Sequence, residues 1–202
     1  MKLSNNLKYS EKSCNRLKVF IILLFLPLLA VPADSENKIR WTEDHRLTWD
    51  YFRGYIDPNR HPNTQAVAKV MIELKTTVKD FRIEFEATSY FVKDGSWTIT
   101  TTSSHVLNHE QIHFDISEVF ARKLRKRLSE IKGLTHRNIQ QRVNAVYQEV
   151  QRAHDDFQKR YDRETDHSNN HRMQEKWNKL VSDLLAQYSA YADTVVPATI
   201  NQ

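Results

Sequence analysis

Residues 107–124 read LNHEQIHFDISEVFARKL, and their apolar side chains recur at the spacing of a helix. Four residues of helix advance by about 400°, so His109 and His113 lie one turn apart on the same face. Ile116 and Phe120 fall within about 60° of His109, which extends this face along the helix. The stretch therefore predicts a long amphipathic helix with two histidines on its core-facing stripe.

The sequence before this helix alternates between apolar and polar residues, which is the period of a strand with one face in water. Asp94 and Gly95 form a dipeptide that is typical of a hairpin turn. Strands are expected at residues 46–49, 66–74, 81–87, 90–92 and 97–100. Together these segments predict a small antiparallel sheet in the first half of the chain.

The second half of the chain, up to residue 192, has a helical period and no proline. One helix is expected over residues 104–132, where Gly133 stops it. A second helix begins at about Asn138, with Gln141 as its partner in a capping box, and a third follows the polar residues 166–170. The order indicates an α+β fold, a small antiparallel sheet followed by three helices.

Residues 109–113 read HEQIH and have the HExxH spacing of a zinc site on a helix. The imidazoles of His109 and His113 suit Zn²⁺, which in a catalytic site takes three protein ligands and keeps one position for water. Glu110 is expected to be the general base that removes a proton from this water. The structural alternative is a hydrogen-bonded pair of core histidines, which leaves Glu110 unexplained.

The third zinc ligand is expected from the polar segment that follows the second helix. We choose His167, because the second helix can run antiparallel to the first and return the chain to the HEQIH end. The alternative ligands are Glu164, His105 and, more weakly, His154 and His171. Asp115 is expected to accept the second N–H of a ligand histidine brought in from another segment, because it lies about 120° from His109 on the helix. A solvated connection between helices is the other interpretation of residues 162–170.

Residues 1–33 have the pattern of a secretory leader. Five basic residues precede an apolar run at residues 19–31, and Val31-Pro32-Ala33 supplies a small-residue cleavage pattern. The run contains Pro27 and is short for a bilayer span, so we expect no stable membrane span after cleavage. This predicts a secreted or periplasmic protein with a single domain at residues 34–202, and an uncleaved membrane anchor is the alternative.

Composition excludes several classes of function. The chain has 202 residues, a formal net charge of +5 and one cysteine, Cys14, in the predicted leader. Cleavage after residue 33 leaves 25 Lys and Arg against 24 Asp and Glu. A mature chain so close to neutral is not expected to bind nucleic acid. Without a thiol it also cannot form disulfides, thiolate nucleophiles or cysteine-ligated zinc sites.

Several segments together resemble the bacterial family filed as domain of unknown function 922. They are LTWDYFRG at residues 47–54, Ser96-Trp97, HEQIHFDI at residues 109–116, YDRETDHS at residues 161–168, and Gln174 with Trp177. Members are described as secreted zinc-dependent proteases, so the resemblance implies a zincin-like domain. His167 is similar to a histidine that members keep before a glycine, and to the third ligand of SprT-like proteases. Here Ser168 replaces that glycine.

The sequence thus predicts a secreted zinc metallopeptidase that hydrolyses peptide bonds, with zinc held by His109, His113 and His167 and with Glu110 as the base. An edge strand that contains Trp97 is expected to pair with an extended peptide or protein substrate. The alternative is a secreted non-catalytic module that binds zinc or a partner protein. Glu110 favours catalysis, because a closed structural zinc site has no use for a base.

Overall fold

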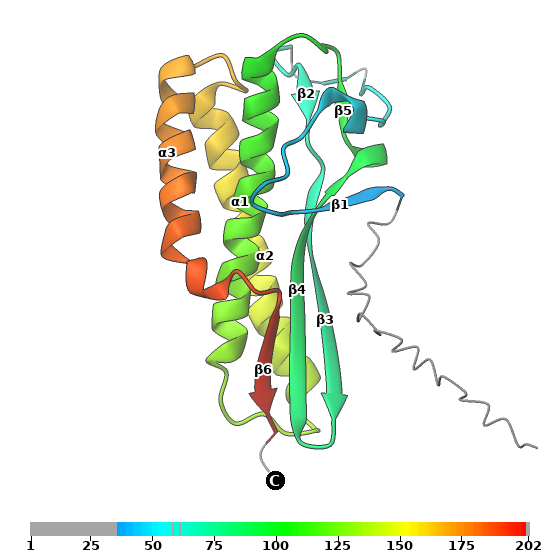
Figure 1. Ribbon diagram of the computed structural model, residues 1–202, viewed down its shortest axis with the longest axis vertical. Coiled ribbons are helices and arrows are strands. Elements are labelled where there is room, and N and C mark those ends of the chain that lie inside the picture. The colour runs from blue at the N-terminus through cyan, green and yellow to red at the C-terminus, as the bar shows by residue number, and fades with distance from the viewer. Residues whose placement is uncertain (1–35, 58, 61, 201–202) are drawn as a thin grey trace, which may run out of the picture. The chain divides into compact units, whose positions relative to one another are not determined.

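In the computed structural model (Figure 1), strand β4 (Arg82–Val92) is the centre of a four-stranded antiparallel sheet. β3 (Val70–Lys79) pairs with β4 along nearly its whole length. β1 (Lys38–Arg40) and β6 (Val195–Thr199) share the opposite edge of β4, where they pair with its end and its beginning. The longest strand therefore has partners on both sides.

The structure describes residues 36–57, 59–60 and 62–200. Residues 34–202 form one compact unit. The predicted leader lies outside the described residues, so its cleavage stays a prediction. Within the described part of the chain, none of the helices is long and apolar enough to span a bilayer.

The alternation along β4 gives the sheet one core face and one solvent face. The buried members on the core face are Ile83, Phe85, Ala87 and Phe91. Arg82 and Glu84, which alternate with them, are exposed. The helical layer covers the core face, with α1 packed directly against β4 (Figure 1), so the apolar side chains of the strand are removed from water.

A second, two-stranded sheet pairs β2 (Ala66–Val67) with β5 (Trp97–Thr98). The single strand predicted at residues 66–74 is therefore divided into β2 and β3 by a break at residues 68–69. At the break, the Ala68 N–H donates a hydrogen bond to the Glu110 carboxylate over 2.6 Å. The interruption thus brings a main-chain donor from the strands to the helix that carries HEQIH.

Two expectations for the strands are wrong, and two strands were missed. Residues 46–48 form no strand, and Trp49 begins a 3-10 helix, Trp49–Tyr51. The Asp-Gly pair does not join β4 and β5 in a hairpin, because Lys93–Gly95 forms another 3-10 helix and β5 pairs with β2. Ser96 redirects the chain here, since its hydroxyl donates to Val92 O and accepts the Lys69 N–H. β1 and β6 were not predicted at all.

The three predicted helices are present, and the α+β class is confirmed. α1 (Ser104–Ser129) is capped by the preceding residue, Ser103, whose hydroxyl accepts a hydrogen bond from the Val106 N–H. α2 (Ile139–Thr165) and α3 (His171–Gln187) follow. A short 3-10 helix, Ser189–Tyr191, then leads the chain back to the sheet through β6.

The ends of two helices differ from the predictions. α1 ends at Ser129, and Gly133 adopts a left-handed conformation with φ 65° in the connection that follows. The predicted capping box at Asn138 is wrong, because the side-chain oxygen of this residue accepts the Thr135 N–H instead. Asn138 therefore stabilises the turn before α2 through a hydrogen bond within that turn.

α1 lies between the core face of the sheet and the other two helices, and it contacts β4, α2 and α3. The main hydrophobic cluster joins Ile116, Phe120 and Leu124 of α1 to the core face of β4, to Tyr161 of α2 and to Trp177 of α3. A smaller cluster of Ile39, Leu47, Phe91 and Phe114 fixes the N-terminal segment. Every element that carries a predicted site residue is thus packed against α1.

A buried guanidinium connects α1 to the end of the chain. Arg125 is completely buried and donates hydrogen bonds to Glu118, to Ala87 O on β4 and to Tyr191 O after α3. A buried charge is tolerated only when it is paired and its donors are satisfied. Arg125 therefore ties the segment leading to β6 to the sheet and to α1.

We expect Arg125→Met to lower the free energy of unfolding by about 3–5 kcal/mol, because it leaves Glu118 and the carbonyl groups without their donor. Arg127→Met is the matched control on the same helix, since the Arg127–Glu149 pair is exposed and such pairs contribute about 0–1 kcal/mol. Guanidinium titration of both variants measures the difference. Equal losses in the two variants would contradict the role of Arg125.

Candidate metal centre

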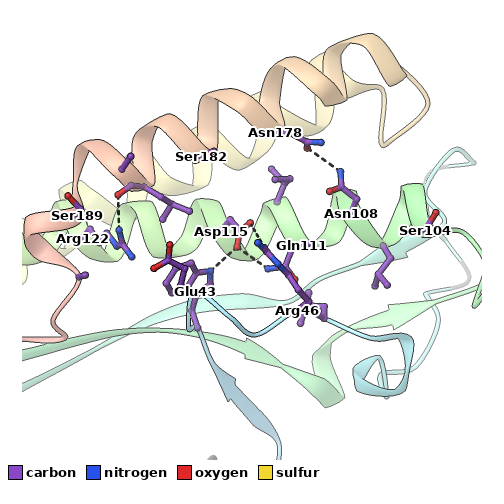
Figure 2. A pocket seen from close by; sticks show the side chains of 17 residues that line it. Glu43, Arg46, Ser104, Asn108, Gln111, Asp115, Arg122, Asn178, Ser182 and Ser189 are labelled. Atoms are coloured by element: carbon purple, nitrogen blue, oxygen red, sulfur yellow. Dashed lines mark hydrogen bonds and ion pairs between the residues drawn. The ribbon is translucent and has the colours of Figure 1, made fainter.

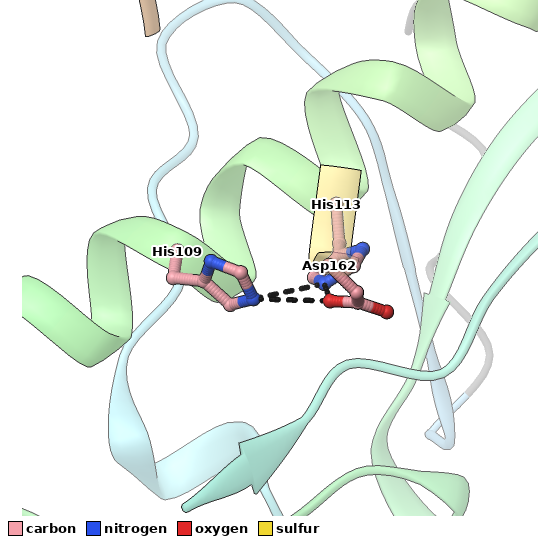
Figure 3. A group of neighbouring side chains, drawn as sticks. All are labelled: His109, His113 and Asp162. Carbon is pink, nitrogen blue, oxygen red and sulfur yellow. Dashed lines mark hydrogen bonds and ion pairs between the residues drawn. The ribbon is translucent and has the colours of Figure 1, made fainter. Parts of the chain in front are cut away.

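His109, His113 and Asp162 meet where the beginning of α1 faces the end of α2 (Figure 3). Asp162 Oδ1 lies 2.9 Å from His113 Nε2 and 3.3 Å from His109 Nε2. The two Nε2 atoms are 3.2 Å apart. The structure therefore brings together the two histidines predicted as ligands and adds a carboxylate from α2.

Tyr161 holds both imidazole rings in place. The His109 ring stacks on the Tyr161 ring with a centroid distance of 4.6 Å and an interplanar angle of 20°. The His113 ring meets Tyr161 edge-on at 4.8 Å. The Tyr161 hydroxyl donates to His109 O over 3.2 Å, and burial raises the pKa of this hydroxyl so that it stays neutral. Packing of α2 against α1 thus positions the rings as well as Asp162.

The three donor atoms fit one metal ion. Zinc binds imidazole nitrogen and carboxylate oxygen at about 2.0–2.2 Å in tetrahedral geometry, which places its ligand atoms about 3.3–3.5 Å apart. The three separations between the Nε2 atoms and Asp162 Oδ1, 2.9, 3.2 and 3.3 Å, are close to this spacing. His109, His113 and Asp162 could therefore hold a metal with three protein ligands and a position left for water.

The charges of the group depend on one another. Burial disfavours a charged His113, but the neighbouring Asp162 carboxylate outweighs burial and raises the pKa of His113 to about 9. Burial likewise disfavours a charged Asp162, and positive charge on His113 and hydrogen bonds from both histidines lower its pKa well below the usual range. Without a metal, the Asp162 carboxylate is therefore ionised and His113 is positively charged at neutral pH.

Glu110, the predicted general base, is buried beside this group. One carboxylate oxygen accepts the Ala68 N–H at 2.6 Å. Burial raises the pKa of Glu110, while the charges of His113 and His109 and the Ala68 hydrogen bond oppose the rise. A carboxyl group with a raised pKa is suited to accept and return a proton near neutral pH.

A cavity of about 330 Å³ opens onto the group, within the size range of ligand sites. Residues 64–70, which include β2, form one wall, and His109, Glu110, His113 and Asp162 lie on the other. Trp97 is buried, its strand β5 pairs with β2, and β5 does not line the cavity. The strand beside the cavity is therefore β2, and pairing of the Trp97 strand with a substrate stays a prediction.

His167, the predicted third ligand, lines the same cavity and lies just after α2. Its Nδ1 is 3.9 Å from Asp162 Oδ1, and it falls outside the group of three. Asp166, His167 and Ser168 all have left-handed backbone, with φ of 47°, 49° and 79°. Such conformations cost about 1–3 kcal/mol per non-glycine residue and are found at functional sites. The role of His167 as a ligand stays a prediction.

The alternative ligands lie around the group without joining it. His105 Nε2 is 2.5 Å from Ser168 O, and its ring stacks on His171 at 3.7 Å, so this pair holds the loop after α2. Glu164 accepts hydrogen bonds from Arg160 and from Trp177. His154 Nε2 accepts a hydrogen bond from Gln158.

Asp115 lies on the side of α1 that faces the N-terminal segment (Figure 2). Its Oδ1 accepts hydrogen bonds from Trp41 Nε1 at 2.8 Å and from Gln111 Nε2 at 2.9 Å. The second ring nitrogens of His109 and His113 meet glutamine side chains. His109 Nδ1 lies 2.9 Å from Gln174 Oε1, and His113 Nδ1 lies 2.7 Å from Gln158 Oε1.

Sequence reasoning missed Asp162, Gln158 and Gln174 as site residues. The helical period offered a signal for two of them, because Gln158 and Asp162 are four residues apart and lie on the face of α2 that carries Tyr161 and Thr165. One interpretation of residues 162–170 was a solvated connection between helices, whereas α2 continues to Thr165. That extra turn aims Asp162 at α1.

The fold and the site define a class of protein: an α+β domain with a His-His-Asp group that could hold a metal. The chain belongs to a bacterial family described as protein of unknown function (DUF922), which matches residues 33–169. The match includes α1, α2 and the three candidate ligands. No curated protein and no solved structure matches the chain.

We expect zinc affinity to rise with pH between pH 6 and pH 8, by about tenfold per pH unit while one proton is displaced. His113, whose pKa is raised to about 9, is a positively charged imidazolium over this range, and it must lose the Nε2 proton before Nε2 binds metal. Competition with a chelator at pH 6, 7 and 8 measures the slope. An affinity that is the same at the three pH values would contradict this assignment of the ligand.

Proposed function

We propose that this protein is a zinc-dependent metallopeptidase. One observation carries the proposal: His109, His113 and Asp162 present three donor atoms at the spacing of one tetrahedral metal, with the Glu110 carboxylate beside them on one cavity. A purely structural zinc site would be closed by four protein ligands and would not use an adjacent base. The arrangement therefore favours hydrolysis over metal storage or scaffolding.

The chain's own residues divide the reaction between them. His109, His113 and Asp162 would hold the metal, which when bound supplies a Lewis acid for the substrate carbonyl and for water. Glu110 would accept the proton of the attacking water and return it to the leaving amine. The Ala68 N–H keeps one Glu110 oxygen oriented through a 2.6 Å hydrogen bond.

The substrate that suits the cavity is an extended peptide. Residues 64–70 line it and include the strand β2, and alternate main-chain groups of a strand point to opposite sides. Gln65 O accepts a hydrogen bond from Ile99 and so faces β5, whereas the Ala68 N–H faces the site. A peptide that lies alongside this segment would place its scissile bond near Glu110 by strand addition.

The cellular location is part of the proposal. Residues 1–33 supply the leader pattern, so we propose that the enzyme is exported and acts on peptides or proteins in the periplasm or outside the cell. The mass of the protein recovered from these fractions would identify its first residue. It would thus distinguish a cleaved leader from a leader that is retained as a membrane anchor.

We expect Glu110→Gln to bind one equivalent of zinc and to lose peptide hydrolysis by a factor of about 10²–10⁴, because an amide cannot accept the proton. Zinc content by mass spectrometry and turnover of a mixed peptide library are measured in parallel. The control is Glu130→Gln, at the exposed C-terminal end of α1. Glu118 is not used because it pairs with the buried Arg125. Zinc binding without any hydrolysis by the wild type would favour the non-catalytic zinc module.

The third ligand is tested by Asp162→Asn and His167→Ala. The distances predict that Asp162→Asn weakens zinc binding by at least about 100-fold, since it removes the charged ligand atom. His167→Ala should retain zinc more tightly than Asp162→Asn. The reverse order would assign His167 as the third ligand and Asp162 as its neighbour.

A further inference from the structure

Two glutamines each contact the Nδ1 atom of one candidate ligand histidine, the ring nitrogen that faces away from the proposed metal. Gln158 Oε1 lies 2.7 Å from His113 Nδ1, and Gln174 Oε1 lies 2.9 Å from His109 Nδ1. The glutamines come from different helices, α2 and α3. Both histidines are therefore contacted in the same way by elements that are distant in sequence.

The orientation of the Gln158 amide is fixed by the main chain. Its Nε2 donates to His113 O over 2.9 Å, and a carbonyl oxygen can only accept. The other end of the amide, Oε1, must then face His113 Nδ1 and accept a hydrogen bond from it. Gln158 thus holds His113 at both its ring and its carbonyl group.

Gln174 is held in a comparable way inside the core. It is 2 % exposed, and its Nε2 donates to the Tyr161 hydroxyl at 2.7 Å and to Asn178 Oδ1 at 2.9 Å. Asn178 also accepts a hydrogen bond from Asn108 (Figure 2). With its amino group used in this way, Gln174 presents Oε1 to His109 Nδ1. A buried amide with these partners is satisfied and rigid.

We infer that Gln158 and Gln174 are positioning residues that fix a proton on Nδ1 of both histidines and so direct both Nε2 lone pairs at one metal ion. The inference rests on the metal centre of the proposed function. An amide oxygen orients an imidazole without adding charge, so among the described residues Asp162 is the anion that contacts the Nε2 atoms. With His109, His113 and Asp162 as its ligands, a divalent metal would keep one net positive charge.

The test is zinc affinity, measured by chelator competition, in Gln158→Met and Gln174→Met. Methionine keeps the length of the side chain and removes both ends of the amide. Each variant should bind zinc about 10–100-fold more weakly than the wild type, the usual effect of removing such a partner. Gln141→Met, at an exposed position of α2, is the control and should stay within about twofold. Thermal unfolding without zinc shows that each variant folds.

A second readout separates positioning from a general loss of packing. In the zinc-loaded wild type, NMR should detect slowly exchanging Nδ1 protons on His109 and His113. Gln158→Met should remove the His113 signal alone, and Gln174→Met the His109 signal alone. If Gln174→Met does not fold, Gln158→Met alone decides the inference.

The outcomes distinguish this inference from the proposed function. A wild type that binds zinc, with both variants within about threefold of it and their Nδ1 protons retained, overturns the positioning role and leaves the metallopeptidase proposal intact. Weakened variants of a protein that hydrolyses no peptide support the positioning role and reject the peptidase. A wild type that binds no zinc overturns both.

Discussion

The arrangement of the whole site depends on one contact, the approach of the Asp162 carboxylate to two imidazoles that are one helical turn apart. The contact requires α1 and α2 to pack with their HEQIH and Tyr-Asp turns opposite each other, and Tyr161 sets this register by stacking on His109. The sheet supports α1 from the other side. Much of the fold therefore holds three side chains at a spacing that could bind one metal ion.

α1 buries several polar side chains, and different regions of the helix pair them differently. Near its beginning, His109 and His113 are paired with Asp162 and with glutamines. Further along, Glu118 and Arg125 pair with each other inside the core. Buried polar groups cost free energy unless they are hydrogen-bonded. The buried polar side chains of α1 thus form a candidate chemical site near its beginning and a structural ion pair further along.

The loop after α2 combines two features found at functional sites. Three consecutive non-glycine residues, Asp166 to Ser168, have positive φ, and the stacked His105–His171 pair contacts the loop at Ser168 O. The loop places His167 on the cavity next to Asp162. The free energy stored there is offset by the packing of α1, α2 and α3 around it.

The sequence allowed the helices and the two histidines to be predicted, because the 3.6-residue period is local and the HEQIH spacing fixes its own geometry. It did not allow β1 and β6 to be predicted, since these short strands exist only through pairing with β4 from opposite ends of the chain. Asp162 was missed for a different reason. One further turn of α2, which ends at Thr165, converts an expected loop residue into a side chain aimed at α1.

The most direct test of the metal centre is anomalous diffraction from crystals of the zinc-loaded protein, recorded on both sides of the zinc absorption edge. The account predicts one strong zinc peak, about 2.0–2.2 Å from His109 Nε2, His113 Nε2 and an Asp162 oxygen, with Glu110 beside the remaining position. A zinc peak elsewhere on the surface, or one bound through Nδ1 of either histidine, would contradict it.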